Sequence, residues 1–179
     1  MKYHIIYADP PWQYRQSKGQ GVAENHYPTM SVKEICNLPV SSIADKNSAL
    51  FLWTTFPQLP EAFQVMSAWG FTYKTVAFVW VKQNKSGNGF FFGLGYWTRS
   101  NAEICLLGVK GHPKRLSKKV HQLIISPIEQ HSKKPDVTRE KIIELVGDLP
   151  RVELFARQET PGWDIWGNEV TSSLSLERK

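Results

Sequence analysis

Short apolar segments that alternate with amphipathic ones constrain the fold of this chain more than any other feature. Five segments are rich in β-branched and aromatic residues, as buried strands are, and they cover residues 3–8, 49–54, 72–82, 102–109 and 152–156. Helical segments separate several of them. This alternation predicts an α/β fold with a doubly wound, mostly parallel sheet, in which ligands bind beyond the carboxyl ends of the strands.

Three segments carry helix signals, and they cover residues 31–38, 58–69 and 136–146. Ser31 and Glu34 have the spacing of a capping box, which satisfies free amide groups of the first helical turn. Gly70 and Gly147 follow the other two segments, and glycine commonly ends a helix. Strands and helices therefore alternate along most of the chain.

The length of 179 residues and the hydrophobic content of 41% suit one compact domain, which we expect over residues 1–170. The polar end, residues 171–179, is expected to be disordered. Cys36 and Cys105 lie far apart in apolar stretches, so we expect neither a disulfide nor a metal site. No segment is long enough to span a bilayer, and the first apolar run is too short for a signal peptide. The sequence thus predicts a cytoplasmic protein without membrane contact.

The first predicted strand leads directly into Asp9-Pro10-Pro11-Trp12, which we call the Asp-Pro-Pro-Trp loop. Its residues can clamp an amino group on a nucleobase. The Asp9 carboxylate and the Pro10 carbonyl would each accept one amino hydrogen, the proline rings would hold the backbone rigid, and the Trp12 ring would stack on the base. Alone, the tetrapeptide could equally be a turn after an edge strand. Its place after a buried strand and its final tryptophan favour a catalytic loop.

The basic residues of the chain gather in one stretch. The formal net charge is +6 and the pI is about 9.3, a balance that favours polyanionic partners. The candidates for contacts with nucleic-acid phosphates are Lys110, Lys114, Arg115, Lys118 and Lys119. A solvated loop is the alternative interpretation of this stretch.

A long segment rich in glycine and phenylalanine, residues 83–100, separates two of the predicted strands. It is too long for an idle connection. Its central run FFFGLGYW is unusually apolar for a loop in contact with water, so self-association into a homodimer through this segment is one hypothesis.

From about Ile5 to Glu169 the chain resembles the MT-A70 family of METTL-like adenine methyltransferases. The ordered matches are IIYADPPW at 5–12, HYPTMS at 26–31, ALFLWTT at 49–55, WVK at 80–82, NAEICLLGVKG at 101–111, HSKKPD at 131–136, VELFAR at 152–157 and GWDIWGNE at 162–169. The resemblance implies a permuted, Rossmann-like methyltransferase fold, with the catalytic loop first and the principal cofactor strand last. It also implies methyl transfer from S-adenosylmethionine to the N6 amino group of adenine.

By this resemblance, the cofactor contacts fall on Asp9, Ser132, Lys134, Pro135, Glu153, Arg157, Thr160, Asn168 and Glu169. Lys134 is expected to meet the methionine carboxylate, a compact anion that suits an ammonium group. Arg157 and Glu153 are expected near the ribose, although they could instead form a surface ion pair. Tyr27 is expected to wall the substrate pocket beside Trp12.

DNA is the expected substrate, because the compact chain fits a bacterial or phage enzyme that receives a flipped or single-stranded adenine. The same reaction on RNA stays open, since no reader of the 2′-hydroxyl is recognisable. Cytosine is disfavoured by the family resemblance. The remaining alternative is an inactive nucleic-acid-binding subunit, and the intact Asp-Pro-Pro-Trp loop argues against it.

Overall fold

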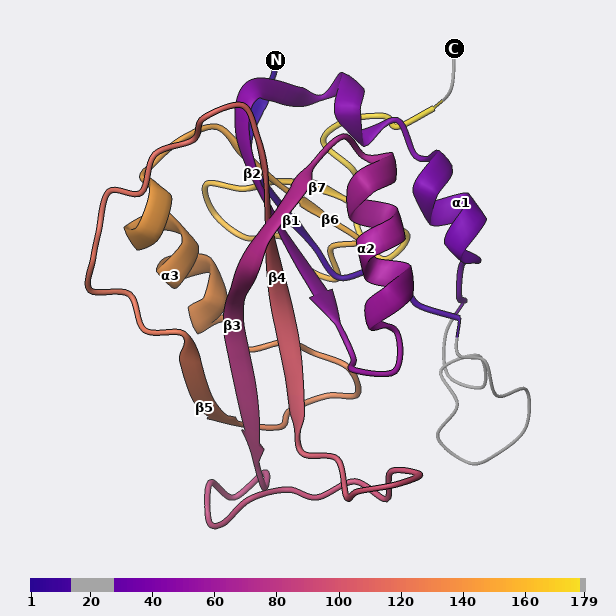
Figure 1. The fold of residues 1–179 in the computed structure, drawn as a ribbon, viewed down its shortest axis with the longest axis vertical. Coiled ribbons are helices and arrows are strands. Elements are labelled where there is room, and N and C mark those ends of the chain that lie inside the picture. Colours follow the sequence, from indigo (N-terminus) through magenta and orange to yellow (C-terminus); the bar gives the residue numbers. More distant parts are fainter. Residues whose placement is uncertain (14–27, 178–179) are drawn as a thin grey trace.

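The computed structural model describes residues 1–13 and 28–177 (Figure 1). Its strands are β1 (Tyr3–Ala8), β2 (Ala44–Thr54), β3 (Thr72–Gln83), β4 (Ala102–Lys110), β5 (Leu123–Pro127), β6 (Arg151–Leu154) and β7 (Asp164–Trp166). Its helices are α1 (Val32–Asn37), α2 (Leu59–Ala68) and α3 (Val137–Val146), with a 3-10 turn at Val40–Ser42. The predicted strands and helices are all present, and β5 and β7 add to them.

The strands form one sheet in the order β5-β3-β4-β2-β1-β6-β7. β1 pairs in parallel with β2 and β6, β3 with β5, and β6 with β7, whereas β4 runs antiparallel to both β2 and β3. Because β2 and β3 both oppose β4, the other strands all point the same way. Their carboxyl ends and the amino end of β4 therefore lie at one edge of the sheet. This arrangement confirms the predicted α/β fold with a mostly parallel sheet.

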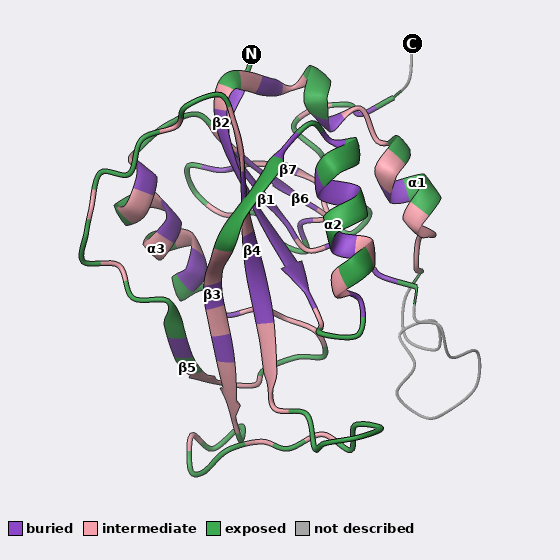
Figure 2. Ribbon diagram, in the orientation of Figure 1, coloured by how far each residue is buried: buried purple, intermediate pink, exposed green. Residues whose placement is uncertain are grey.

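The helices cover both faces of the sheet, with α1 and α2 on one face and α3 on the other (Figure 1). Alternate residues of β1 and β2 belong to two separate cores. Both strands are buried over most of their length (Figure 2). Ile6 and Leu52 pack on the side of α2, whereas Ile5 and Phe51 pack with Ile142 on the side of α3. All five are fully buried, and each such burial contributes ~1.5–3 kcal/mol. Burial on both faces explains why these strands are nearly continuous apolar runs.

The helix ends follow the signals in the sequence. Glu34 N–H donates to Ser31 Oγ and Ser31 N–H to Glu34 Oε1, both at 3.1 Å, so the predicted capping box of α1 is confirmed. Gly147 follows α3 with a φ of 105°, a backbone conformation that residues with a Cβ rarely adopt. Among residues 1–13 and 28–177, no helix combines the length and hydrophobicity that a membrane span requires.

One strand end differs from its prediction in a way that shapes the functional edge. The last strand was expected to continue to residue 156, but β6 ends at Leu154. Phe155 adopts a φ of 61°, in the left-handed region, which breaks the ladder. For a bulky residue this conformation is uncommon, and it concentrates at turns and ligand sites. The chain therefore turns sharply just where the strand reaches the carboxyl-end edge.

Residues 171–177 pack against the domain, although the sequence predicted disorder from 171 onward. Leu176 is buried in the core on the side of α1 and α2. The Ser173 N–H donates to the Ile165 carbonyl at 2.7 Å, which joins the segment to β7. The leucines of this segment stand singly among polar residues, so composition alone concealed their role. Residues 178 and 179 lie outside the described part of the chain.

Candidate active site

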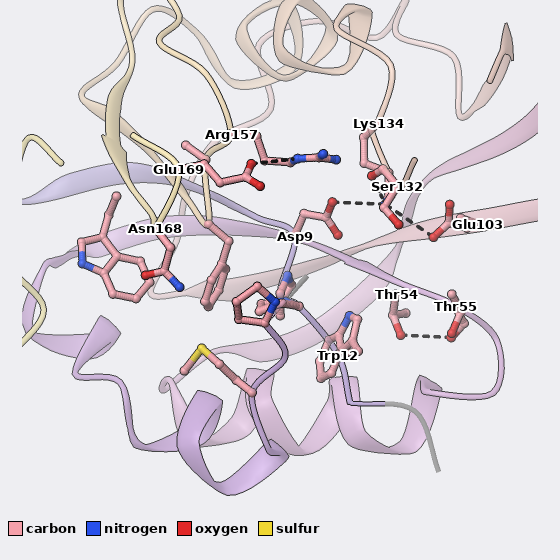
Figure 3. A pocket seen from close by; sticks show the side chains of 17 residues that line it. Asp9, Trp12, Thr54, Thr55, Glu103, Ser132, Lys134, Arg157, Asn168 and Glu169 are labelled. Carbon is pink, nitrogen blue, oxygen red and sulfur yellow. Dashed lines mark hydrogen bonds and ion pairs between the residues drawn. The ribbon is translucent and has the colours of Figure 1, made fainter. Parts of the chain in front are cut away.

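A cleft opens at the carboxyl-end edge of the sheet, where β1, β2, β6 and β7 end and β4 begins (Figure 3). About 900 Å³ of space lies in and above it, part of which is open solvent. The predicted site residues that line it are Asp9, Pro10, Pro11, Trp12, Ser132, Lys134, Arg157, Asn168 and Glu169. Motifs from both ends of the sequence thus meet in one place.

The Asp-Pro-Pro-Trp loop is held by backbone and side-chain hydrogen bonds. The Trp12 N–H donates to the Pro10 carbonyl at 2.9 Å, and the Met30 N–H donates to the Pro11 carbonyl at 3.0 Å. The Trp12 Nε1 donates to the Trp53 carbonyl at 3.1 Å, and the indole is buried. The Trp12 ring is therefore a fixed wall of the cleft, in a position set before any ligand arrives.

Two hydrogen-bond acceptors lie on adjacent residues of this wall. The Pro10 carbonyl already accepts the N–H of Trp12, but a carbonyl oxygen has two lone pairs, so one stays available. The Asp9 side chain is 28% exposed and lines the cleft. The pair of acceptors that the amino clamp requires is therefore present on Asp9 and Pro10.

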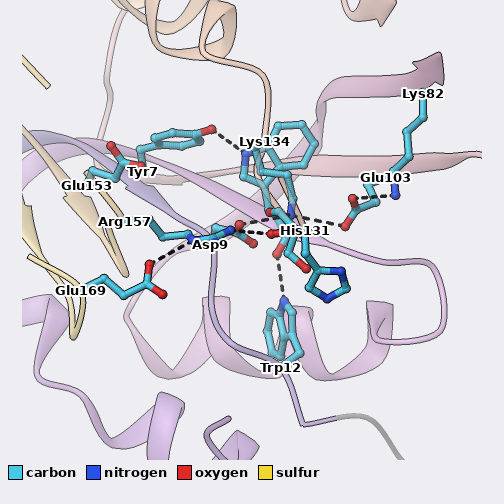
Figure 4. A network of polar contacts seen from close by, with 12 residues as sticks. Tyr7, Asp9, Trp12, Lys82, Glu103, His131, Lys134, Glu153, Arg157 and Glu169 are labelled. Carbon is cyan, nitrogen blue, oxygen red and sulfur yellow. Dashed lines mark hydrogen bonds and ion pairs between the residues drawn. The ribbon is translucent and has the colours of Figure 1, made fainter. Parts of the chain in front are cut away.

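Lys134 stands at the centre of a chain of alternating charges (Figure 4). Its Nζ lies 3.1 Å from Asp9 Oδ2 and 3.5 Å from Glu103 Oε1, and it donates to the Ser132 carbonyl at 3.0 Å. Beyond Glu103, the Lys82 Nζ lies 3.0 Å from Glu103 Oε2. The Lys134 side chain is only 9% exposed, so water screens its charge little. Lys134, predicted to bind the cofactor, thus contacts the predicted catalytic carboxylate.

The pKa values of the two carboxyl groups beside Lys134, those of Asp9 and Glu103, shift in opposite directions. Burial raises the pKa of Asp9 above its ordinary value, Lys134 counteracts the rise, and the negative charge of Glu103 adds to it. Burial also disfavours ionised Glu103, but the charges of Lys134 and Lys82 outweigh it and lower the pKa of Glu103. Active sites assign different roles to similar groups in this way. Glu103 therefore holds its negative charge more readily than Asp9 does.

Glu153 lies near the end of β6 and forms an ion pair with Arg139 of α3. The Arg139 Nε donates to Glu153 Oε2 at 2.8 Å and its Nη2 donates to Oε1 at 2.9 Å. Both residues line a second cavity of about 600 Å³, which shares Asp9 and Lys134 with the cleft. The ion pair considered from the sequence is not the one formed, because Glu153 pairs with Arg139 rather than with Arg157. A ribose hydroxyl that binds Glu153 would have to donate to carboxylate lone pairs that Arg139 does not occupy.

Arg157 joins three loops at the edge of the cleft. Its Nε donates to Glu169 Oε2 at 3.0 Å, and its Nη1 donates to the His131 carbonyl at 2.7 Å. The side chains of Arg157 and Glu169 are about half exposed, so this pair contributes only ~0–1 kcal/mol. A polar ligand in the cleft can replace it at little cost. Asn168, the neighbour of Glu169, lines the same wall.

Two of the predicted cofactor contacts, Thr160 and Pro135, are not among the residues that line the two cavities. Thr160 has a buried hydroxyl without a hydrogen-bond partner among the described residues, and it lines neither cavity. Pro135 follows Lys134 but also lines neither. Tyr27 lies outside the described residues. The cofactor contacts predicted for Thr160 and Pro135, and the substrate contact predicted for Tyr27, stay predictions.

The predicted phosphate contacts lie away from the cleft. Because β4 is antiparallel to β2, its last residue, Lys110, lies at the edge opposite Glu103, about 24 Å away along the strand. The following segment runs past α3 to β5 (Figure 1). The residues concerned, none of which lines either cavity, are Lys110, Lys114, Arg115, Lys118 and Lys119. Lys110 is therefore too distant to hold the phosphate of a nucleotide whose base occupies the cleft.

Sequence reasoning missed several residues of the site. Thr54 ends β2 and Thr55 follows it, and both line the cleft. The strand-end rule that singled out Asp9 also applies to them. Glu103 stands in the quoted NAEICLLGVKG segment, but it reaches the cleft only because β4 runs antiparallel. No pattern in the sequence points to Phe155 or Arg139. The left-handed backbone of Phe155 and the pairing of Arg139 in α3 with Glu153 in β6 are tertiary features.

The fold and the cleft together define a class of protein. An α/β sheet presents a rigid loop with two adjacent acceptors beside an aromatic wall, and a buried ammonium group lies next to the acceptors. A cleft of this kind, with converging polar and charged side chains at the carboxyl ends of parallel strands, is typical of an enzyme active site.

Comparison with known proteins identifies the family. The MT-A70 family model matches residues 3–169. The type II methyltransferase M.MunI of Mycoplasma sp is 37% identical over 94% of this chain and 78% of its own length. An N(6)-adenosine-methyltransferase MT-A70-like protein of Drosophila melanogaster is 30% identical, and the METTL3 subunit of Danio rerio is 29% identical, each over 94% of this chain. The chain spans only 27% and 28% of the lengths of these two. It belongs to the MT-A70 family, whose methyltransferases depend on S-adenosylmethionine.

Proposed function

We propose that this chain transfers a methyl group from S-adenosylmethionine to the N6 amino group of adenine in DNA, with residues 1–170 as a single catalytic domain. The observation that carries the proposal is the pair of adjacent acceptors on Asp9 and Pro10 beside the fixed ring of Trp12. DNA is supported by the type II methyltransferase, which the chain matches over 78% of its length, against 27–28% for the adenosine methyltransferases.

The chemistry of the amino group explains the two acceptors. The nitrogen lone pair of adenine is delocalised into the ring, so the amino group is a poor nucleophile. When Asp9 and Pro10 each accept one amino hydrogen, the nitrogen becomes pyramidal and its lone pair is free to attack. The pKa of the nitrogen falls as the new bond forms, so Asp9 need not be a strong base. Its carboxylate, whose pKa burial raises, can take the released proton and pass it to water in the cleft.

The residues of the cleft fit the cofactor. The buried ammonium of Lys134 suits the methionine carboxylate, and Asn168 and Glu169 offer polar groups for the ribose hydroxyls. Phe155 supplies an apolar wall. When bound, S-adenosylmethionine supplies an electrophilic methyl group on a sulfonium centre. Lys134 then has a carboxylate partner other than Asp9, which leaves an Asp9 oxygen for the amino group of the base.

The adenine must leave its stack to reach this clamp. In a duplex its amino group is paired and covered by neighbouring bases, so the enzyme acts on a flipped or single-stranded nucleotide. Trp12, which lines the cleft, would cover one face of that base in place of its former neighbour. Single-stranded DNA is therefore the simplest substrate for a first assay.

The proposal is tested by incubating the protein with methyl-labelled S-adenosylmethionine and unmethylated single-stranded DNA, followed by digestion to nucleosides. We expect N6-methyldeoxyadenosine as the labelled product and its loss in Asp9→Ala. The matched control is Asp148→Ala, which removes a carboxylate that is 85% exposed and lines neither cavity. Absence of methyladenine with the unaltered protein, or labelling that survives Asp9→Ala, would contradict the proposal.

RNA is the second candidate substrate, because two of the reported relatives carry the name adenosine methyltransferase. The same assay with RNA of matched sequence separates the two, and we expect the higher kcat/KM with DNA. Calorimetric titration with S-adenosylmethionine separates both from an inactive nucleic-acid-binding subunit, which would not bind the cofactor.

A further inference from the structure

A cluster of exposed apolar side chains lies on the connection between β3 and β4. We call residues 90–97 the aromatic loop. Leu94 and Tyr96 are 88% and 80% exposed, Trp97 is fully exposed, and Phe90 and Phe92 each expose about half of their surface. Exposed groups of large apolar side chains mark binding surfaces. The proposed reaction at the cleft does not use them.

The base of the aromatic loop is tied down by hydrogen bonds. The Phe91 N–H donates to the Lys82 carbonyl at 2.9 Å, and the Gly93 N–H donates to the Ser100 carbonyl at 2.7 Å. The Asn101 side-chain amide donates to the carbonyls of Lys82, at 3.1 Å, and Phe91. These hydrogen bonds fix the base of the aromatic loop to the ends of β3 and β4, and the aromatic rings of the loop are exposed to solvent.

This extension rises from the rim of the cleft. Lys82 precedes the connection and Glu103 follows it, and their side chains form an ion pair at 3.0 Å. Glu103 itself lines the cleft. Figure 1 shows the connection projecting beyond the carboxyl-end edge of the sheet, the edge at which Asp9 lies. A polymer that places one unit in the cleft would extend past this rim.

The charge of the connection fits a polyanion. Residues 83–100 contain Lys85 and Arg99 and no acidic residue. The Arg99 guanidinium lies 5.9 Å from the centre of the Phe92 ring, so cation and ring are presented together. Rings with interspersed cations are how proteins bind single-stranded nucleic acid, because every base has a face that can stack.

We propose that the aromatic loop is the surface on which the unpaired bases next to the target adenine stack. This inference rests on the proposed function, which requires that the adenine leave its stack and thereby exposes its neighbours. Phe92, Tyr96 and Trp97 supply faces for those neighbours, and Leu94 is suited to enter between two of them, as apolar wedges do in bent DNA. The loop replaces the stacking that the strand loses.

A second copy of the chain is the competing occupant. Stable interfaces between copies bury about 800 Å² on each partner and involve about 20–30 residues, more than a projecting loop of eight residues offers. Separate rings on a glycine-rich loop also suit separate bases better than one continuous hydrophobic face. Size and charge therefore both favour nucleic acid.

The test measures affinity for two labelled single-stranded DNA oligonucleotides by fluorescence anisotropy. Each contains one adenine, flanked in one case by thymines and in the other by abasic sites, so that only the neighbouring bases differ. We expect the protein to bind the thymine-flanked strand about tenfold more tightly, the effect of about one base–aromatic stack. In Tyr96→Ala/Trp97→Ala this preference should disappear, whereas Trp97→Phe should keep it.

The matched control is Tyr73→Ala, which removes an exposed aromatic ring at the amino end of β3, on the opposite edge of the sheet. This variant should keep the preference. Calorimetric titration with S-adenosylmethionine should give the same affinity for all variants, which checks that the cleft is intact. Sedimentation analysis of the unaltered protein and of Tyr96→Ala/Trp97→Ala gives the oligomeric state.

Equal affinity of the unaltered protein for both oligonucleotides would overturn the inference. A dimer that dissociates in the double variant, without a preference for flanking bases, would assign the aromatic loop to a second copy and overturn it too. The methyl-transfer assay reports separately on the proposed function. A preference for flanking bases without methyl transfer would keep the aromatic loop as a stacking surface for unpaired bases, but it would refute the proposed reaction and with it the target adenine.

Discussion

The Nζ of Lys134 lies 3.1 Å from Oδ2 of Asp9, so the cation assigned to the cofactor and the carboxylate assigned to the base are partners in the free protein. In the proposed mechanism this ion pair couples the binding of the cofactor to the binding of the base. A carboxylate that binds Lys134 weakens its hold on Asp9, and an Asp9 oxygen then becomes available for the amino group. Glu103, 3.5 Å from the same Nζ, keeps the ammonium in place during the exchange.

Replacement of Lys134 by methionine removes the proposed partner of the cofactor carboxylate. A hydrogen bond to a charged group contributes about 1.5–3 kcal/mol, so Lys134→Met should weaken cofactor binding about 10- to 150-fold, as measured by calorimetric titration. Lys134→Arg keeps the charge and should retain more of the affinity. An affinity in Lys134→Met equal to that of the unaltered protein would refute the assignment.

The same substitution predicts a change in pH dependence. Lys134 lowers the pKa of Asp9, so Lys134→Met should raise that pKa further. Because the clamp requires ionised Asp9, the acid limb of kcat/KM should move to higher pH. The measurement is the pH profile of methyl transfer with saturating cofactor.

Glu103→Gln should move the acid limb in the opposite direction. The negative charge of Glu103 raises the pKa of Asp9, so a neutral amide at position 103 should lower that pKa and extend activity to lower pH. Asp148→Asn, which neutralises an exposed carboxylate, is the control and should leave the profile unchanged. A shift of the acid limb to higher pH in Glu103→Gln would contradict the statement that the charge of Glu103 raises the pKa of Asp9.

Asp9→Asn should stabilise the folded protein at neutral pH while it abolishes activity. The fold raises the pKa of Asp9 above its ordinary 3.8, so the folded state loses stability as pH rises through that raised value. The neutral variant escapes this loss. Because Asp9 is 28% exposed, we expect a gain below about 1 kcal/mol, or roughly 2–4 °C in Tm.

Thermal unfolding of both proteins between pH 3 and 8 measures this difference. The two Tm values should converge below pH 3.8, where Asp9 is protonated in both the folded and the unfolded state. A variant that is less stable than the unaltered protein at pH 7 would show that the contact with Lys134 outweighs the burial of the Asp9 charge.

Local signals in the sequence predicted the part of the site that follows β1. Asp9 follows β1, and a buried apolar run with a turn behind it is recognisable without a structure. Glu103 was not predictable in this way, because it begins a strand and reaches the cleft only through the reversed direction of β4. The same reversal carries Lys110 to the far edge. Strand direction depends on pairing between distant segments, which no local pattern encodes.

Short structural features were not predicted from the sequence for a different reason. β7 has three residues, too few for a periodic pattern, and it forms only beside β6. Leu176 packs into the core although its neighbours in the sequence are mostly polar. In both cases tertiary contacts supply the stability that local propensity lacks.

The bidentate pair between Arg139 and Glu153 predicts a large effect on stability. Both side chains are nearly buried, and removal of one partner leaves an uncompensated charge in a poorly solvated place. Arg139→Met should therefore lower the free energy of unfolding by about 3–5 kcal/mol, as measured by urea denaturation. Arg157→Ala is the control, because it removes only an ion pair that is about half exposed and an exposed hydrogen bond to the His131 carbonyl, so its loss of stability should stay well below that of Arg139→Met.

A second substitution separates the buried charge from lost packing. In Arg139→Met/Glu153→Gln the carboxylate is replaced by a neutral amide of similar shape, so much of the stability lost in Arg139→Met should return. Cofactor affinity need not return with it, since Glu153 lines the cavity that adjoins the cleft. If the double variant were as unstable as Arg139→Met, the packing of the Arg139 side chain, rather than its charge, would hold α3 against β6.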